Sequence, residues 1–400
     1  MVARLRVIIV PLLSFRDNLR ALPPAAWILF GGTFINRFGT FVIPFLILYL
    51  TRIAYTIAQA GLAVGAYGIG VLIASSVGGH LADRMGRRNT IVLSMFGSAA
   101  AMLALSQARG YAAIVVLTCI TGSLSELYRP ASYALVGDLV GDEHRVTAFG
   151  LYRFAVNLGF AAGPATAGFL ADHSFTLLFI GDAATSIVYG LIALFALPQG
   201  LQSYVKSERT GEALRVAARD RPYVIFLLAT LCITLVDFQM GSTFALHVKS
   251  LGFPSSTYGL LISTNGLLIV LFELGITQWT RRFHPRPMIA LGYLLAGVGF
   301  ALTGFARTVP ALAATVVVWT LGEMISSPVA GAYAVQLAPE QYRGRYLGLF
   351  MMMWSLGMVI GPPAGTLVFE HNPAAVWAAC GALGVIGAAL MLQRRQSTRS

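Results

Sequence analysis

Six charged residues lie deep inside long apolar runs of this 400-residue chain. They are Arg37, Glu126, Arg129, Arg153, Asp237 and Glu323. A charge at the centre of a bilayer costs about 2.5–3.5 kcal/mol on insertion scales, so such groups line a water-filled cavity or pair with one another. Carboxylates in that setting can carry protons, and arginines can bind a carboxylate or phosphate through two parallel hydrogen bonds. These residues therefore offer proton transfer and recognition of charged small molecules.

The local surroundings separate two of the acids from the third. Glu126 and Arg129 are three residues apart and share a helix face, so Glu126 is the acid most readily paired. Asp237 and Glu323 have no cation within a helical turn in sequence, and burial favours the protonated form of a carboxylate. We expect Asp237 and Glu323 to carry protons, with Glu126 as the next candidate. The alternative, in which the acids and arginines pair off entirely, stays open.

The composition is that of a polytopic membrane protein. Hydrophobic residues make up 57% of the chain and charged residues 11%, with a mean hydropathy of +0.74, whereas soluble proteins carry roughly 25% charged residues. Each of the three cysteines lies alone in an apolar run, without metal-binding spacing. The chain also lacks the G-x-x-x-x-G-K phosphate-binding loop. We therefore predict no enzyme activity, no cofactor and no metal.

Twelve apolar runs are long enough to cross about 30 Å of hydrocarbon. They are residues 25–50, 57–82, 89–107, 111–137, 146–171, 175–197, 222–248, 256–280, 287–306, 309–337, 344–369 and 373–392. One long polar stretch divides them six and six. We predict an interfacial segment (1–24), two six-helix bundles (25–198 and 222–393), a linker (199–221) with a helix near Glu212–Arg219, and a tail (394–400).

Basic residues predict the orientation, because loops on the cytoplasmic side carry more Lys and Arg. With both termini cytoplasmic, most of the 28 Lys and Arg residues lie inside and only Arg52, Arg109, Lys249 and Arg307 lie outside. The net charge of +12 then faces anionic lipid, and no nucleic-acid partner is needed to explain it. We expect a bacterial inner-membrane protein that works as a monomer in the lipid bilayer.

The two halves repeat each other at an offset of 198 residues. Gly61 matches Gly259, Arg84 matches Arg282, Pro130 matches Pro328, Arg145 matches Arg343 and His173 matches His371. The segment LGFAAGPATAG from Leu158 likewise faces LGMVIGPPAGT from Leu356. One register kept across six spans indicates duplication. The sequence thus predicts two parallel bundles related by an axis along the membrane normal.

The loop between spans 2 and 3, GGHLADRMGRR, concentrates charge between two uncharged runs. Asp83 can accept hydrogen bonds there, Arg87 and Arg88 can pair with acids on neighbouring helix ends, and Asp138 is the best candidate. Gly79 and Gly86 allow close helix approach and a tight turn.

The motif residues Gly79, Asp83, Arg84, Gly86, Arg87 and Arg88 match the signature loop of the major facilitator superfamily, which the whole chain resembles in span number and duplication. The resemblance implies an all-α fold of twelve transmembrane helices in two pseudo-symmetric six-helix bundles. It also implies a cytoplasmic gate, with Asp138 as a partner, that joins the halves in the outward-open state. The alternative is a topological anchor.

A second motif lies in span 5: Gly159, Gly163, Pro164 and Gly168. Small residues four apart let helices pack closely, and the motif is similar to one associated with antiporters of that superfamily. Its partial repeat at Gly357, Gly361 and Pro362 leaves a purely structural role open.

The resemblance places spans 1, 4, 7 and 10 around a central cavity. We expect Asn36, Arg37, Arg129, Tyr133, Arg153 and Asn157 to line it. The function implied is secondary transport by alternating access, with proton-coupled efflux of lipophilic or cationic small molecules. Two alternatives remain: transport of an anionic metabolite, which the arginines favour, and a non-transporting receptor. We interpret the acids nearer the span ends, Asp172, Asp182, Glu273 and Glu370, as interfacial.

Overall fold

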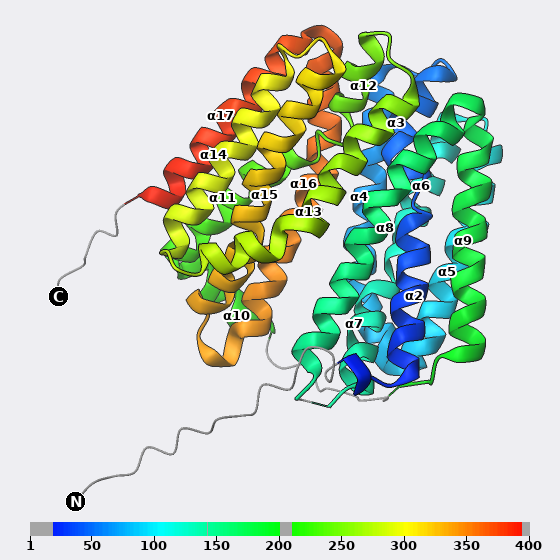
Figure 1. Cartoon of the computed structure of the whole chain (residues 1–400), viewed down its shortest axis with the longest axis vertical. Coiled ribbons are helices and arrows are strands. Elements are labelled where there is room, and N and C mark those ends of the chain that lie inside the picture. The colour runs from blue at the N-terminus through cyan, green and yellow to red at the C-terminus, as the bar shows by residue number, and fades with distance from the viewer. Residues whose placement is uncertain (1–18, 142, 201–209, 394–400) are drawn as a thin grey trace, which may run out of the picture.

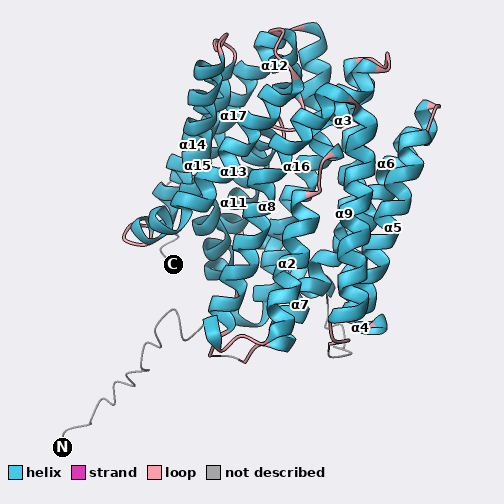
Figure 2. Ribbon diagram, turned by 45° about the vertical axis from the view of Figure 1, so that its right-hand side comes forward, coloured by secondary structure: helices cyan, strands magenta, loops and turns pink. Residues whose placement is uncertain are grey.

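The computed structural model describes residues 19–141, 143–200 and 210–393 (Figure 1). Within these ranges every regular element is a helix (Figure 2). The helices of the N-terminal half are α2 (Pro24–Phe38), α3 (Val42–Arg52), α4 (Ile57–Met85), α5 (Arg87–Gln107), α6 (Tyr111–Glu126), α7 (Tyr128–Leu139), α8 (Arg145–His173) and α9 (Phe175–Ala196). Most of the predicted interfacial segment and all of the predicted tail lie outside the described residues.

The C-terminal half follows after α10 (Thr210–Arg219), which is the helix expected in the linker. Its helices are α11 (Arg221–Asp237), α12 (Thr243–Ser250), α13 (Ser255–Thr280), α14 (Pro285–Thr303), α15 (Val309–Leu337), a short 3-10 turn η1 (Glu340–Tyr342), α16 (Arg343–His371) and α17 (Pro373–Leu392). Eleven helical segments of the described chain are long and apolar enough to cross a membrane. The twelfth predicted span, 222–248, is present as α11 and α12, each too short to count alone.

Three spans are interrupted near their middle, which the apolar pattern did not indicate for spans 1 and 7. The break in span 1 separates α2 from α3. At this break Asp182 of α9 hydrogen-bonds to backbone N–H groups at the start of α3. Asp182 Oδ2 accepts hydrogen bonds from the backbone N–H groups of Phe41 (3.2 Å) and Val42 (3.3 Å). Asp182 is buried, so its interpretation as interfacial is wrong: it holds a helix break together.

The break in span 4 lies where Pro130 predicts it. Proline has no N–H group, so the carbonyl of the residue four positions earlier loses its helical partner. The helix α6 ends at Glu126, and α7 begins at Tyr128. At the break, the Tyr128 N–H group donates to a side chain of another helix, Ser94 Oγ of α5, at 3.1 Å. The bend therefore falls at the buried acid of this span.

The helix boundaries repeat with the offset seen in the sequence. The helices α8 and α16 run from Arg145 to His173 and from Arg343 to His371, and α4 and α13 begin at Ile57 and Ser255. The two bundles lie side by side in Figure 1. They meet mainly through α4 against α16 and α8 against α13.

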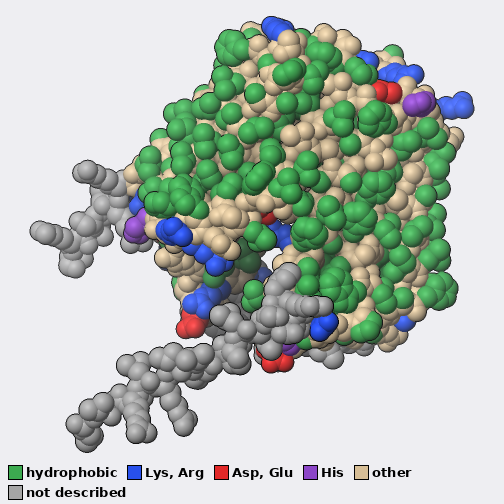
Figure 3. Space-filling view, in the orientation of Figure 1, with side chains coloured by type: hydrophobic (Ala, Val, Ile, Leu, Met, Phe, Trp, Pro, Cys, Tyr) green, Lys and Arg blue, Asp and Glu red, His purple; other side chains and the backbone are tan. Residues whose placement is uncertain are grey.

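The bundles touch at one end and separate at the other. We call the end that holds the start of α4 and the last turn of α8 the closed face, and the opposite end the open face. Near the closed face a Cβ added at Gly61 would clash with Thr366, and one at Gly259 would clash with the carbonyl oxygen of Pro164. Toward the open face, a Cβ added at any of four glycines would have no neighbouring atom within 4 Å: Gly79, Gly150, Gly275 and Gly348. Figure 3 shows the resulting hollow between the halves, with charged side chains visible in it.

Candidate functional site

A cavity of about 220 Å³ lies between the two bundles and contains both acids that the sequence predicts to carry protons. Asp237 is the last residue of α11, at the break in span 7, and Glu323 lies in the middle of α15. Aromatic side chains surround them: Phe160, Phe238, Tyr258, Phe300, Trp319 and Trp354. The N-terminal half contributes Ile43, Pro44 and Val64 as well as Phe160. The site is therefore an apolar, aromatic pocket that holds two carboxylates.

Asn265 of α13 fixes the position of Glu323. Its Nδ2 donates to Glu323 Oε2 and to Thr320 Oγ1, both at 3.0 Å. Asn265 is buried, and one amide nitrogen carries two hydrogens, so both bonds can form together. Sequence reasoning missed Asn265. A lone amide in the apolar run 256–280 was the available signal.

The charges of the N-terminal half form a compact network of their own. Arg37 Nη1 and Nη2 donate to the two carboxylate oxygens of Glu126, at 3.3 and 3.4 Å. Arg129 Nη1 donates to Glu126 Oε2 at 3.1 Å, and the Arg37 guanidinium lies over the ring of Tyr128. The pairing expected between Glu126 and Arg129 is present, and Arg37 joins it.

The third arginine pairs across the halves. Arg153 of α8 bonds to Glu273 of α13, and Asn157 Nδ2 donates to Glu273 Oε2 at 3.5 Å. The Glu273 side chain is only 14% exposed. Its interpretation as interfacial is therefore wrong, because it is the carboxylate that neutralises Arg153. Among the described residues, neither Asp237 nor Glu323 forms an ion pair of this kind.

The six residues expected to line a substrate cavity do not line the pocket of Asp237 and Glu323. Asn36 is buried within its own bundle, where Nδ2 contacts Met95 Sδ at 3.4 Å. Tyr133 is half-exposed and packs against the ring of Tyr152. Asn36 and Arg37 line a smaller cavity of the N-terminal bundle together with Glu126. The side chains of Arg129, Tyr133 and Arg153 are about half-exposed, and their place in a substrate path stays a prediction. No cluster of metal ligands occurs among the described residues.

The charged loop motif lies at the open face. Gly86 adopts a φ of 90° between α4 and α5, a conformation that favours glycine. Arg87 Nη1 donates to Asp83 Oδ1 at 2.7 Å, and Arg87 Nε lies 3.3 Å from Asp138 Oδ2. The contact expected between Arg87 and Asp138 is present. All three residues belong to the N-terminal half, so these contacts do not bridge the bundles while this face is open.

Two glycines of the span 5 motif, Gly159 and Gly163, pack α8 onto α2, and the third, Gly168, packs α8 against Ser255 and Ser256 of α13. A Cβ at Gly159 or Gly163 would lie 2.8 or 2.5 Å from backbone atoms of Phe38. Gly357 and Gly361 pack α16 onto α11 in the same way. Close helix packing accounts for the repeat of this motif in both halves.

Replacing Glu126 by Gln is expected to destabilise the protein strongly. Glu126 neutralises Arg37, and removing one partner of a buried ion pair costs about 3–5 kcal/mol because the remaining charge stays uncompensated. The Arg129 side chain is 52% exposed, so Arg129→Gln is the matched control and should cost little. Thermal unfolding in detergent compares the two variants. Equal melting temperatures of Glu126→Gln and Arg129→Gln would contradict the role of Glu126 as the carboxylate that compensates the buried charge of Arg37.

Comparison with known proteins agrees with the family resemblance that the loop motif indicates. The family model described as Major Facilitator Superfamily matches residues 29–257 and 226–400. A Na(+), Li(+), K(+)/H(+) antiporter of Planococcus maritimus is 24% identical and covers 84% of this chain and 87% of its own length. The quinolone resistance protein NorA of Staphylococcus aureus is 22% identical, over 92% and 96%.

Among solved structures, a mutant of the nucleoside transporter NupG superposes with a TM-score of 0.81, over 92% of this chain and 100% of NupG, at 16% identity. That likeness supports the predicted fold of twelve helices in two bundles. The match of the family model to both halves shows that the chain belongs to the Major Facilitator Superfamily and is an integral membrane transporter.

Proposed function

We propose that this transporter exports lipophilic cations in exchange for protons, by alternating access. The observation that carries the proposal is the pocket of Asp237 and Glu323. It combines aromatic rings with two carboxylates that form no ion pair among the described residues. Aromatic faces attract a cation, and an apolar lining accepts the rest of a lipophilic molecule.

The coupling follows from the cost of an unpaired charge in this pocket. A carboxylate surrounded by apolar groups is disfavoured when ionised, so it binds a proton or a cationic partner. A cationic substrate and a proton therefore compete for Asp237 and Glu323. Asn265 donates to one oxygen of Glu323, which orients the carboxylate for either partner. Export of one cation and import of protons then alternate at the same groups.

The sidedness of the proposal rests on the basic residues. Arg84, Arg87, Arg88, Arg145, Arg281, Arg282 and Arg286 cluster at the ends of helices at the open face, which the positive-inside rule assigns to the cytoplasm. On this assignment both termini are cytoplasmic and the structure is an inward-facing state. Substrate would enter the hollow from the cytoplasmic side. The names of the two curated relatives, an ion/proton antiporter and a resistance protein, favour export by antiport.

The anion alternative loses part of its support. It required arginines free to bind a carboxylate or phosphate, yet Arg37, Arg129 and Arg153 each bond to a glutamate. A substrate anion would compete with these glutamates for Arg37 and Arg153, whereas Arg129 is half-exposed and shares Glu126 with Arg37. The two acids of the aromatic pocket would repel it as well.

The variants Asp237→Asn and Glu323→Gln are expected to lose pH-driven transport while keeping downhill exchange. We would measure ethidium uptake into proteoliposomes with an acidic lumen and the membrane potential clamped. Wild-type protein should concentrate ethidium, and each variant should reduce this accumulation at least about tenfold, because the group that trades proton for cation is absent. Glu340→Gln, an exposed acid, is the matched control. If both variants accumulate ethidium to the wild-type level, proton coupling does not depend on Asp237 and Glu323, and Glu126 becomes the next candidate.

Asp83→Asn is expected to slow transport and to favour the inward-facing state. We propose that the loop motif joins the two halves when the open face closes, so Asp83→Asn destabilises the closed form of that face more than the open form, in which Asp83 bonds, among the described residues, only to Arg87 of its own half. Cysteine accessibility at both faces measures the balance. Glu143→Gln, an exposed acid at the same face, is the control. An unchanged rate and accessibility pattern in Asp83→Asn would leave the motif as a topological anchor.

A further inference from the structure

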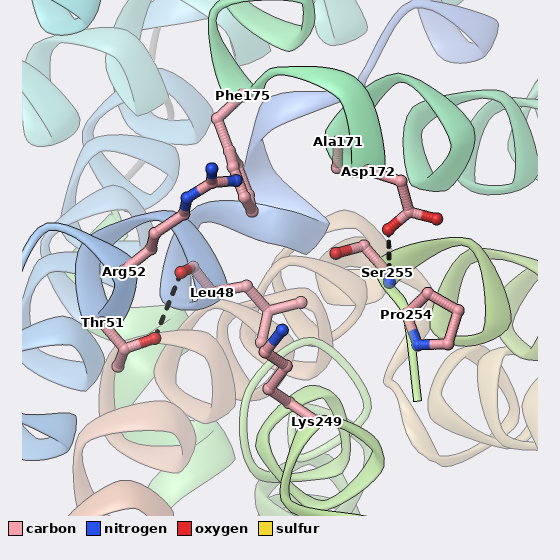
Figure 4. Close-up of a pocket in the computed structure, with 9 residues that line it drawn as sticks. All are labelled: Leu48, Thr51, Arg52, Ala171, Asp172, Phe175, Lys249, Pro254 and Ser255. Carbon is pink, nitrogen blue, oxygen red and sulfur yellow. Dashed lines mark hydrogen bonds between the residues drawn. The ribbon is translucent and has the colours of Figure 1, made fainter. Parts of the chain in front are cut away.

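At the closed face, a carboxylate from one half binds the first N–H groups of a helix in the other half. Asp172, in the last turn of α8, accepts hydrogen bonds from Ser255 N–H at Oδ1 (2.7 Å) and from Ser256 N–H at Oδ2 (3.1 Å). Ser255 is the first residue of α13. Figure 4 shows Asp172 directed at the Ser255 amide. The interpretation of Asp172 as interfacial overlooked this contact.

The same contact occurs a second time. Glu370, in the last turn of α16, accepts a hydrogen bond at Oε2 from the N–H group of Ala58, at 2.9 Å. Ala58 is the second residue of α4. Asp172 and Glu370 are equivalent under the offset of 198 residues, and so are Ser256 and Ala58. Each half therefore supplies one carboxylate and receives one.

These bonds fill positions that the receiving helices leave open. The first N–H groups of a helix have no intrahelical partner, and they carry partial positive charge. The residue before α13 is Pro254, which makes no side-chain cap. The residue before α4, Thr56, caps Gln59, and Ala58 is left to Glu370. The opposite bundle thus completes each cap only while the closed face stays shut.

Water can reach the first of these contacts. A cavity of about 550 Å³ opens beside it, lined by residues of both halves: Leu48, Thr51, Arg52, Ala171, Asp172, Phe175, Lys249, Pro254 and Ser255. The Arg52 guanidinium lies over the ring of Phe175, and Lys249 approaches from the other bundle (Figure 4). Asp172 and Glu370 are both exposed. A carboxylate released here is hydrated at once, so the bond can break and re-form.

We infer that Asp172 and Glu370 are gating residues that hold the closed face shut, and that both bonds must break when this face opens. The inference rests on the alternating access of the proposed function. It assigns to the closed face a pair of capping hydrogen bonds between the bundles. Because the two contacts are equivalent, each should bias the equilibrium in the same direction.

The test is a distance measurement across the closed face in nanodiscs. Spin labels at Arg109→Cys and Arg307→Cys, exposed and equivalent positions, are placed in a background in which Cys119, Cys232 and Cys380 are replaced. Asp172→Ala or Glu370→Ala should increase the population with long distances roughly fivefold, as expected for the loss of one cap. The double variant should increase it further.

Asn372→Ala is the matched control. Asn372 caps α17 from within its own half, through the N–H groups of Ala374 and Ala375. Its loss should lower the melting temperature without lengthening the distance. Asp172→Asn and Glu370→Gln keep the side-chain size and remove the charge, so they should also increase the population with long distances, but by less than the alanine variants. They replace the alanine variants in the test if those fold poorly.

The outcomes separate the two levels of the proposal. If the wild-type distances respond to pH or to tetraphenylphosphonium but none of the acid variants differs from wild type, the gating role of Asp172 and Glu370 is wrong and alternating access stands. If Asn372→Ala lengthens the distance as much as they do, the effect is general helix destabilisation and the inference also fails. If no condition moves the wild-type distances, alternating access fails and the gate fails with it.

Discussion

The fold is governed by the cost of charge in an apolar medium. Glu126 pairs with both Arg37 and Arg129 inside the N-terminal bundle, and Glu273 pairs with Arg153 between the bundles. Pairing of this kind lets a charge remain in the membrane without being reactive. Asp237 and Glu323 of the C-terminal half lie instead in a shared aromatic pocket, and neither forms an ion pair among the described residues. One duplicated scaffold thus holds a paired charge network in one half and, in the proposed function, carboxylates that exchange protons in the other.

The duplication also explains how the same helices can close at one end and part at the other. Near the closed face, glycines such as Gly61 and Gly259 bring α4 against α16 and α8 against α13. Toward the open face the same helices diverge, and Arg153–Glu273 is a contact that crosses the hollow there. A rigid bundle that rocks about such a contact would exchange the two faces. The repeated caps at Ser256 and Ala58 fit that symmetry.

Structural features that depend on neighbouring residues in the sequence could be predicted. Features that depend on contacts between residues far apart in the sequence could not. Apolar run length gave the spans, the 198-residue register gave the two bundles, and Pro130 gave the break in span 4. The pairing of Glu126 with Arg129 followed from a spacing of three. The break in span 1 depends on Asp182, 140 residues away from Val42, and no local pattern reports such a contact. For the same reason, acids near span ends were interpreted as interfacial although they bind the opposite bundle or a helix break.

The central claim is that a proton and a cationic substrate compete for Asp237 and Glu323. The most direct measurement is proton release when tetraphenylphosphonium binds to the purified protein in weakly buffered detergent solution. Wild-type protein should release protons on binding, and the release should be lost in the Asp237→Asn, Glu323→Gln double variant while Glu340→Gln behaves as wild type. Binding by wild-type protein without proton release, or undiminished release from the double variant, would contradict the claim.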